Sequence, residues 1–552
     1  MVVLGVVIAA CQAAPSTSPS AGESSVPFQS ASYPQGGPAD CAYGGEIAQI
    51  RAVDRLTVEF ALCHPDPAFL SKIALANNAI QDSDWLTLYG PNQRLRVEAN
   101  GTGPYMVTEG TPAPSTGITL GRYDGYWGNK AIAAEVVLEW RSSAAARLLA
   151  LQSGSVDGID NPRPNDLATI EGDSTLNLEP SEALNTMYIG MSNIFAPFDS
   201  LTFRHGLAMG IDRQRIIDNA FPPGSSLAGW FTPCAIEFAC VGDPWYAYDK
   251  GAAIALLAEP GFPGPLTTHI YYRDEVGCGL PDPSVIAQEL QTQLQDDLDI
   301  TADLRPQESA TFMANLSAGL LDGLYLLEWC AAYPDVTAFL DHHFNNPGNQ
   351  QFGTIDASIS VPLMAGDQAA DPTAREAAYV AANNAIRDIV PMIPIAHGGS
   401  GTAWKADVVG AVASPLNGES FAAMDPGGRT RLVWMQSASP RSFYCADAID
   451  GNSVRLCHNI FEQLYAFRPG TAMVTPALAE LCDPNEELTV WTCHLRSGVT
   501  FHDGAELDAN DVLMSYAAQW DYEHPIHGGS TGRFVGWAGE FGPFLNAPSP
   551  AP

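Results

Sequence analysis

Residues 490–520 read VWTCHLRSGVTFHDGAELDANDVLMSYAAQW, and this stretch decides how the chain is interpreted. The pattern from Val490 to Phe501 predicts a strand, a turn at Ser497-Gly498 and a second strand. A helix is predicted from Asp508 to Trp520, because Asp508 can cap the first turn and Asp511 stands at the third helical position. Its apolar residues share one face, made of Leu513, Tyr516, Ala517 and Trp520.

The remaining chain also mixes strand and helix patterns. Strands are predicted at 56–62, which alternates with period two, and at 136–140. Residues 199–221 predict one helix, which begins at Asp199 or Ser200, carries an apolar residue every fourth position and ends before two prolines. Such alternation over about 500 residues predicts an α/β protein of several lobes.

Composition restricts the classes of function. The chain has 62 Asp+Glu against 26 Lys+Arg, a formal net charge of −36, and is 46% hydrophobic. The hydrophobic share is sufficient for large cores. The acidic balance excludes binding to a nucleic-acid backbone and docking on an anionic membrane through a basic patch. We expect a monomer without a nucleic-acid partner.

The N-terminus resembles a lipoprotein signal. The apolar run MVVLGVVIAA precedes Cys11, and Ile8-Ala9-Ala10-Cys11 resembles a lipobox, in which the cysteine thiol receives a diacylglycerol. The run is too short to span a bilayer, and Ser, Pro, Ala and Gly dominate the tether that follows at 12–40. We expect a signal at 1–11, lipidation of Cys11 and a location on the extracytoplasmic face of the membrane. The alternative is a chance apolar N-terminus with a free cysteine.

The cysteines agree with an oxidising compartment. Eleven cysteines minus Cys11 leave an even number, and no C-x-x-C motif occurs. Neighbours in sequence are paired first, and the last pair follows by elimination. The predicted pairs are Cys41 with Cys63, Cys234 with Cys240, Cys445 with Cys457, Cys482 with Cys493, and Cys278 with Cys330.

Several motifs resemble those of family 5 extracellular solute-binding proteins, the peptide- and nickel-binding receptors of ABC importers. The signature "FHDG…TAeDVvfSl" is matched by Phe501-His-Asp-Gly504, by residues 507–512 and by Ser515-Tyr516. Further matches cover about 41–545. They are Gly101-Thr-Gly-Pro-Tyr105, Tyr126-Trp-Gly128, Leu151-Gln-Ser-Gly154 with Val156-Asp157, residues 197–213, Pro476-Ala-Leu-Ala-Glu480 and Leu495-Arg-Ser-Gly498.

The order of these motifs departs from the family. FHDG normally precedes GTGPY, whereas here it follows by about 400 residues. The resemblance therefore implies a circular permutation, which is tolerated where the original termini lie close together on the surface. Residues near 41 and 545 are then expected to be neighbours. The alternative is a fragment of a tandem pair whose neighbouring copy supplies the exchanged piece.

The resemblance implies an α/β fold of the periplasmic-binding-protein type, class II (cluster C). This fold has two lobes, an extra subdomain and a hinge at the ligand cleft. The implied division places lobe I at 98–200 plus 398–450, the extra subdomain at 41–97 plus 451–545, and lobe II at 201–397.

Two segments carry the expected ligand contacts. Residues 328–335 (EWCAAYPD) resemble a lobe II motif whose Asp pairs with the α-ammonium of a peptide, but Ala332 stands at that position. Trp329, Tyr333 and Asp335 remain candidates there, Asp335 as a substitute acid. On the other wall, Gln436, Ser437 and Ala438 follow a strand that offers backbone groups in peptide-binding relatives. Tyr444 is a further aromatic candidate, and for the aromatic residues core packing is an equal alternative.

The expected function is capture of a peptide-like or other polar solute by hinge closure and its delivery to the permease of an ABC transporter. The alternative is a solute sensor or secreted chaperone on the same fold. Catalysis is not expected, because His502-Asp503-Gly504 is interpreted as a turn. No cofactor or protein-held metal is expected, since adjacent His342 and His343 would point about 100° apart on a helix.

Overall fold

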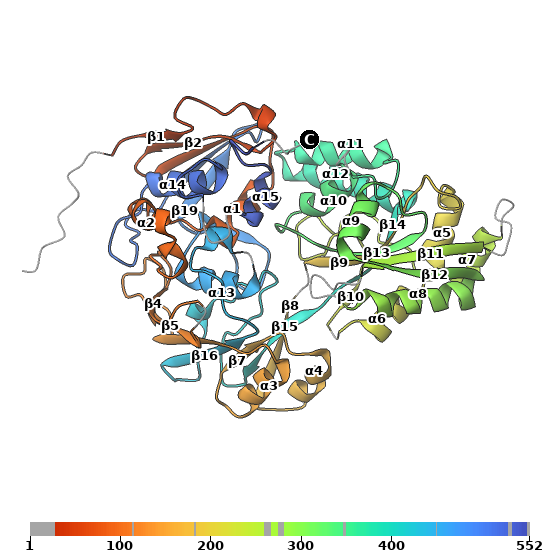
Figure 1. Cartoon of the computed structure of the whole chain (residues 1–552), viewed down its shortest axis with the longest axis horizontal. Coiled ribbons are helices and arrows are strands. Elements are labelled where there is room, and N and C mark those ends of the chain that lie inside the picture. The colour runs from red at the N-terminus through yellow and green to blue at the C-terminus, as the bar shows by residue number, and fades with distance from the viewer. Residues whose placement is uncertain are drawn as a thin grey trace, which may run out of the picture.

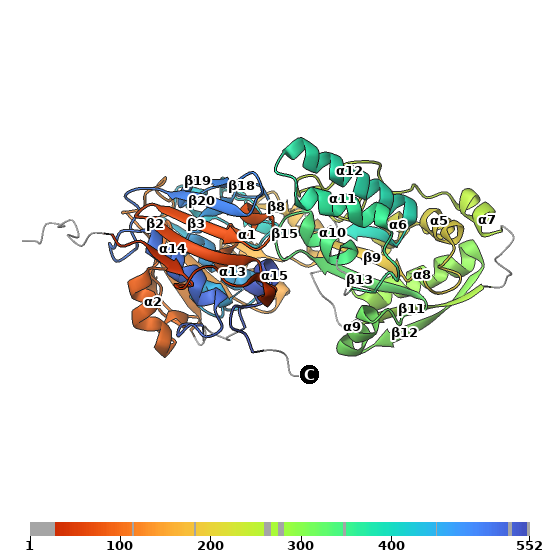
Figure 2. The same cartoon turned by 90° about the horizontal axis from the view of Figure 1, so that it is seen from above.

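The computed structural model contains three main β-sheets in two bodies (Figures 1 and 2). It describes residues 28–112, 115–181, 184–222, 224–258, 266–273, 281–345, 349–448, 450–527 and 533–548. In Figure 1, one body combines the two ends of the chain, and the other is built from its middle third. This α/β architecture confirms the predicted fold class.

The first sheet joins the N-terminal and C-terminal parts of the chain. Its order is β1 (Ala31–Tyr33), β2 (Ile47–Asp54), β3 (Thr57–Leu62), β20 (Val490–Leu495) and β19 (Ala479–Pro484), all antiparallel. Its helices are α1 (Phe69–Ile73), α2 (Ser83–Tyr89), α14 (Ala509–Trp520) and α15 (Val535–Phe541). Helix α14 packs on β1–β3, and Tyr516 contacts Phe60 edge-to-face at 5.1 Å between ring centroids.

The second sheet has seven strands. Its order is β4 (Tyr105–Glu109), β5 (Gly117–Arg122), β6 (Glu135–Trp140), β16 (Arg431–Gln436), β7 (Gly158–Asp160), β15 (Ser400–Lys405) and β8 (Leu176–Ser181). The late strand β16 lies between β6 and β7 and is parallel to both. The helices of this region are α3 (Ala144–Gln152), α4 (Pro164–Glu171) and α13 (Gly451–Ile460), and a small ribbon pairs β17 (Tyr465–Phe467) with β18 (Val474–Pro476).

The third sheet has six strands and forms the other body. Its order is β10 (Ser226–Leu227), β14 (Met392–His397), β9 (Asn185–Met191), β13 (Leu324–Cys330), β11 (Leu266–Arg273) and β12 (Ile300–Gln307). Eight helices surround it, namely α5 (Leu201–Gly210), α6 (Arg213–Ala220), α7 (Lys250–Leu257), α8 (Pro283–Leu298), α9 (Ser309–Ser317), α10 (Thr337–Phe344), α11 (Ala357–Asp367) and α12 (Pro372–Ile389).

The chain passes between the two bodies twice. Strands β9 to β14 are consecutive in sequence and all belong to the six-stranded sheet, so the connections are the segment between β8 and β9 and the segment between β14 and β15. Strand β9 was expected with lobe I, but it pairs with β13 and β14. Likewise α13 was expected in the extra subdomain, but its Leu456 and Ile460 are buried in the core of the seven-stranded sheet.

Local predictions were largely confirmed. The strands at 56–62 and 136–140 are β3 and β6. Helix α14 begins with the predicted capping box of Asp508 and Asp511. The strand expected up to Phe501 is wrong beyond β20: the Phe501 N–H bonds to the Ala505 carbonyl at 2.8 Å, closing a tight turn in which Gly504 has a φ of 96°.

The single helix predicted for 199–221 is also wrong. Helix α5 ends at Gly210 and α6 begins at Arg213. Between them Ile211 is extended, and the Asp212 carboxylate accepts the N–H of Arg215 at 3.1 Å. Asp212 therefore caps a new helix, a role that competes with its place in a helix interior.

Residues near 41 and 545 are neighbours, as expected. The N–H of Glu46 donates to the carbonyl of Phe541 at 2.9 Å, and the hydroxyl of Tyr33 donates to the carboxylate of Asp521. Four of the predicted disulfides are confirmed, namely Cys41–Cys63, Cys234–Cys240, Cys445–Cys457 and Cys482–Cys493. Cys330 is disulfide-bonded, and its predicted partner Cys278 lies outside the described residues, as does Cys11.

Candidate functional site

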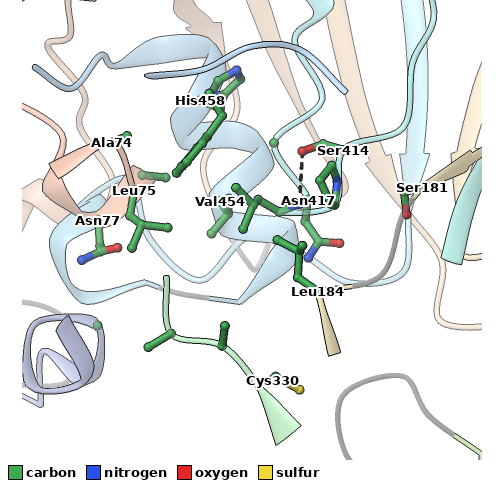
Figure 3. A pocket seen from close by; sticks show the side chains of 18 of the residues that line it. Ala74, Leu75, Asn77, Ser181, Leu184, Cys330, Ser414, Asn417, Val454 and His458 are labelled. Atoms are coloured by element: carbon green, nitrogen blue, oxygen red, sulfur yellow. Dashed lines mark hydrogen bonds between the residues drawn. The ribbon is translucent and has the colours of Figure 1, made fainter. Parts of the chain in front are cut away.

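A cavity of about 650 Å³ lies where the two bodies meet. Several strands meet its wall at one end: Asn161 follows β7, Ser181 closes β8, Cys330 closes β13 and Gly398 follows β14. Further lining comes from residues 74–77, 184–185 and 331–332, the loop 414–418, helix α13, the turn 467–470 and helix α15. Figure 3 shows the labelled side chains around this space, with Val454 and His458 on one side and Cys330 on the opposite side. The volume is that of a typical small-ligand site.

The cavity wall carries very little charge for so acidic a chain. Among its lining residues, only Glu540 and Arg468 belong to the Asp, Glu, Lys or Arg types. The other polar side chains include Asn77, Asn417 and His458, and burial lowers the pKa of His458 below its ordinary value. Neutral polar groups with one carboxyl and one guanidinium suit a polar solute that carries few charges.

Glu540 reaches the cavity from α15, a short helix whose other residues are apolar or glycine. The side chain is 5% exposed. Its carboxylate accepts hydrogen bonds from the amide of Asn77 at 3.0 Å and from that of Asn78 at 2.6 Å. Burial raises the pKa of Glu540 to about 7, although both amides and the nearby Lys72 oppose this shift.

Lys72 on α1 lies behind this wall and is also buried. Its ammonium pairs with Glu46 at 2.5 Å and with Asp66 at 3.0 Å. The same ammonium lies 5.0 Å from the ring centroid of Tyr333, which belongs to the segment after β13 in the other body. Burial and the adjacent Asp66 raise the pKa of Glu46 well above its ordinary value, while Lys72 holds that of Asp66 below its ordinary value.

The seven predicted ligand contacts lie outside the lining of this cavity. Trp329 borders a separate cavity of about 150 Å³, where its ring stacks on His342 at 4.1 Å. Tyr333 contacts Lys72. Asp335 is buried and pairs with Arg375 at 2.8 Å, so its charge is already compensated within the six-stranded body.

The residues predicted on the other wall are engaged in internal contacts. Gln436 is fully buried and donates to the carbonyl of Ala438 at 2.9 Å. The hydroxyl of Ser437 donates to Asp160 at 3.2 Å. Tyr444 is buried with its ring edge-to-face with that of Phe534. A ligand role for the seven residues stays a prediction.

Ala332, where the sequence lacks the expected acid, does line the cavity. It lies opposite α15, because a Cβ built on Gly539 would be 3.3 Å from the Cβ of Ala332. Sequence reasoning missed Glu540, Arg468, Asn77 and His458. The available signal was a single acid inside the apolar segment 534–541 (FVGWAGEF), which indicates a buried carboxyl.

Comparison with known families decides the assignment. The model of "Bacterial extracellular solute-binding proteins, family 5 Middle" matches residues 15–351 and 473–532, well over half of the chain. The chain belongs to this family. The family 5 protein is 25% identical over 408 residues to "Peptide transport periplasmic protein SapA" of Salmonella typhimurium, covering 69% of this chain and 70% of SapA.

Two further similarities support the assignment. "Di/tripeptide-binding protein 2" of Pseudomonas aeruginosa is 24% identical over 383 residues, covering 68% of this chain and 71% of that protein. The solved structure of HbpA2 from Haemophilus parasuis superimposes with a TM-score of 0.65 at 25% identity, over 69% of this chain and 75% of HbpA2. In the described part of the family 5 protein, no helix is long and apolar enough to cross a membrane.

Proposed function

We propose that this family 5 protein is an extracytoplasmic receptor that captures a peptide-like or other polar solute and delivers it to the permease of an ABC importer. The observation that carries the proposal is the cavity of about 650 Å³ lined by both bodies. A ligand that contacts both walls stabilises the closed arrangement over the open one. The similarity to SapA and to a di/tripeptide-binding protein supports a small peptide as the solute.

Hinge closure is part of the proposal. In the described part of the chain, two connections join the bodies, one between β8 and β9 and the other at residues 398–399 between β14 and β15. Both are short, so dihedral changes in a few residues can rotate the six-stranded body against the rest. We propose that the lobes follow the sheets, with lobe II extended to include β9. We propose that the contact between Lys72 and Tyr333, which joins the two bodies, belongs to the closed form and is broken on opening.

The proposal also includes a lipid anchor at Cys11 and a circular permutation of the chain. Cys11 would carry the lipid. The flexible tether predicted at 12–40 is wrong in its last part, because Ala31–Tyr33 form β1 and pair with β2 in the first sheet. The part of the predicted tether that precedes the described residues would give the receptor its reach from the membrane. The hydrogen bond between Glu46 and Phe541 supports a circular permutation, because it joins the ends that the usual order would connect.

Native mass spectrometry of the purified chain, with Cys11→Ser to prevent lipidation, tests the proposed function. A solute retained by the native protein and released on denaturation is expected. Val454→Trp, which fills the cavity from α13, should abolish its retention. Val409→Trp is the matched control, because Val409 is 66% exposed and lies outside the lining. A protein that is empty and gives no thermal shift with a solute library would favour the sensor or chaperone alternative.

Small-angle scattering tests the hinge. The radius of gyration should decrease when the released solute is added back to the emptied protein. An unchanged radius with bound solute would overturn hinge closure while leaving solute capture intact.

A further inference from the structure

Buried acids outnumber buried bases near the cavity. We call Glu46, Asp66, Lys72 and Glu540 the Lys72 group. Their side chains are almost inaccessible: Lys72 is 6% exposed, Glu46 and Asp66 are 5% and 6%, and Glu540 is 5% exposed as a residue. Three carboxyls therefore share one ammonium in a region that water hardly reaches.

The ammonium of Lys72 is committed to two of these carboxyls. Its ion pairs run to Glu46 and Asp66, both within 3.0 Å. Glu540 receives only neutral amide donors, from Asn77 and Asn78. Among the described residues, no ion pair to Glu540 occurs within 4.0 Å. A buried carboxylate without a cation is costly, so this position lacks one positive charge.

Among the described residues, the groups packed around Glu540 supply no other cation. Asn77 and Asn78 face it from the short 3₁₀ turn after α1, and Lys72 acts on it from α1. The phenol of Tyr516 on α14 is close enough for its own pKa to respond to Glu540. From the other body, Ala332 faces the neighbouring Gly539. Glu540 itself is one of the residues that line the cavity.

We infer that Glu540 is the specificity-determining residue for a protonated amine of the ligand. This inference rests on the proposed function and specifies the solute class. The ligand ammonium would enter through the cavity and supply the missing positive charge of the Lys72 group. Its hydrogen bonds to the carboxylate would be charge-assisted, which is the stronger kind.

Arg468 favours a second charged group on the ligand, a carboxylate. It is the one other charged residue in the lining, on the turn between β17 and β18. In the described part of the chain its exposed guanidinium forms no ion pair, and only its backbone is hydrogen-bonded. A free carboxylate of the ligand can pair with it bidentately. A zwitterion, such as a small peptide with free ends, therefore fits this wall better than a polycation.

Binding of an amine beside Glu540 should be coupled to release of a proton from its carboxyl. A purely structural role of Glu540 would show no such coupling. Burial raises the pKa of Glu540 to about 7. An ammonium beside the carboxyl favours its ionised form, so binding near pH 7 releases a proton from Glu540. The affinity for an amine should therefore rise as the pH increases from about 6 to 8, while the amine itself stays protonated.

The test compares Glu540→Gln with Glu506→Gln, which makes the same change at a surface carboxyl whose side chain is 64% exposed. The probes are a mixture of tripeptides with free ends and the same mixture with acetylated amino ends. Native mass spectrometry detects binding, and titration calorimetry gives the affinity. Calorimetry in two buffers of different ionisation enthalpy also gives the number of protons released. The unmodified receptor and Glu506→Gln should bind free-ended tripeptides and release a proton. Glu540→Gln should lose roughly 30-fold or more in affinity, as expected when one partner of a buried charge pair is removed. Acetylated tripeptides should bind all three proteins equally weakly.

Other outcomes separate this inference from the proposed function. Tripeptides that bind equally well with free or acetylated ends, or Glu540→Gln with unchanged affinity and proton release, would overturn the role of Glu540 and leave the receptor intact. A co-purified solute without a positive charge would do the same. An empty receptor that binds neither mixture nor any library solute would overturn the proposed function itself. Circular dichroism of Glu540→Gln excludes misfolding as the cause of a loss.

Discussion

Asp335 and Glu540 are two buried acids on opposite sides of the cavity region, and they differ in what neutralises them. Asp335 pairs with Arg375 at 2.8 Å inside the six-stranded body. Glu540 is held by two amides and borders the cavity. The first acid is neutralised by a cation within the fold, whereas the second has only neutral partners and is the one that we propose as the partner of a ligand ammonium. A charge that the protein does not balance internally is therefore the better guide to a binding site than an acid near a sequence motif.

The largest expected effect comes from removing Arg375, the cation that pairs with Asp335. Arg375→Met would leave Asp335 unpaired near the half-buried carboxyls of Asp341 and Asp367. Removal of one partner of a buried ion pair typically costs about 3–5 kcal/mol of folding stability. Urea unfolding should show this loss. Arg441→Met is the matched control, since its side chain is 74% exposed and the change should stay within about 0.5 kcal/mol. If Arg375→Met lowers the unfolding free energy by less than about 1 kcal/mol, Asp335 does not depend on its cation, and the proposed difference between Asp335 and Glu540 is wrong.

The second prediction concerns the stability of the empty receptor against pH. The pKa of Glu540 is raised from its ordinary value to about 7, so its ionisation destabilises the fold as pH rises through that range. Glu540→Gln removes this penalty. Relative to the unmodified protein, the variant should gain roughly 1–3 kcal/mol in unfolding free energy between pH 5 and pH 8.

Unfolding curves at both pH values check this prediction. Glu506→Gln should give parallel profiles, because its carboxyl lies on the surface. A variant with Glu540→Gln that instead loses stability at pH 8 would mean that Glu540 is a structural residue like Asp335.

The third prediction moves the acid across the cavity. Ala332→Asp places a carboxyl opposite Gly539, next to the position of Glu540. In a background of Glu540→Gln, it should recover about tenfold of the lost affinity for free-ended tripeptides, because the positive charge regains a nearby partner. Ala331→Asp, one residue earlier in the lining, is the control for a general increase in negative charge. Equal recovery by both variants would show that the position of the acid is unimportant.

The smallest expected effect concerns the contact between the bodies. Tyr333→Leu removes the ring that lies over the Lys72 ammonium. A cation–π contact that excludes water contributes about 1 kcal/mol, so the affinity for solute should fall about fivefold through a weaker closed state. The loss should be the same for free-ended and acetylated tripeptides, unlike the loss caused by Glu540→Gln. A selective loss for free ends would assign Tyr333 to the amine site.

Features that depend on neighbours along the chain can be predicted from the order of residues. The capping box of Asp508 and Asp511 defined α14, the alternation at 56–62 defined β3, and short spacing paired Cys482 with Cys493. The family motifs added the fold class. Local reasoning failed at Ile211, where a cap at Asp212 breaks the expected helix. It also failed at β9, because strand pairing, rather than sequence distance, assigns a strand to its body.

Only the tertiary structure decided the site. Glu540 and Asn77 are 463 positions apart, and their hydrogen bond exists because the two ends of the chain share one sheet and its helices. Asp335 was a candidate by its motif, but Arg375, 40 positions later, neutralises it. Whether a buried charge is neutralised depends on its distance from an opposite charge and on how well water is excluded. Neither property can be predicted from the sequence alone.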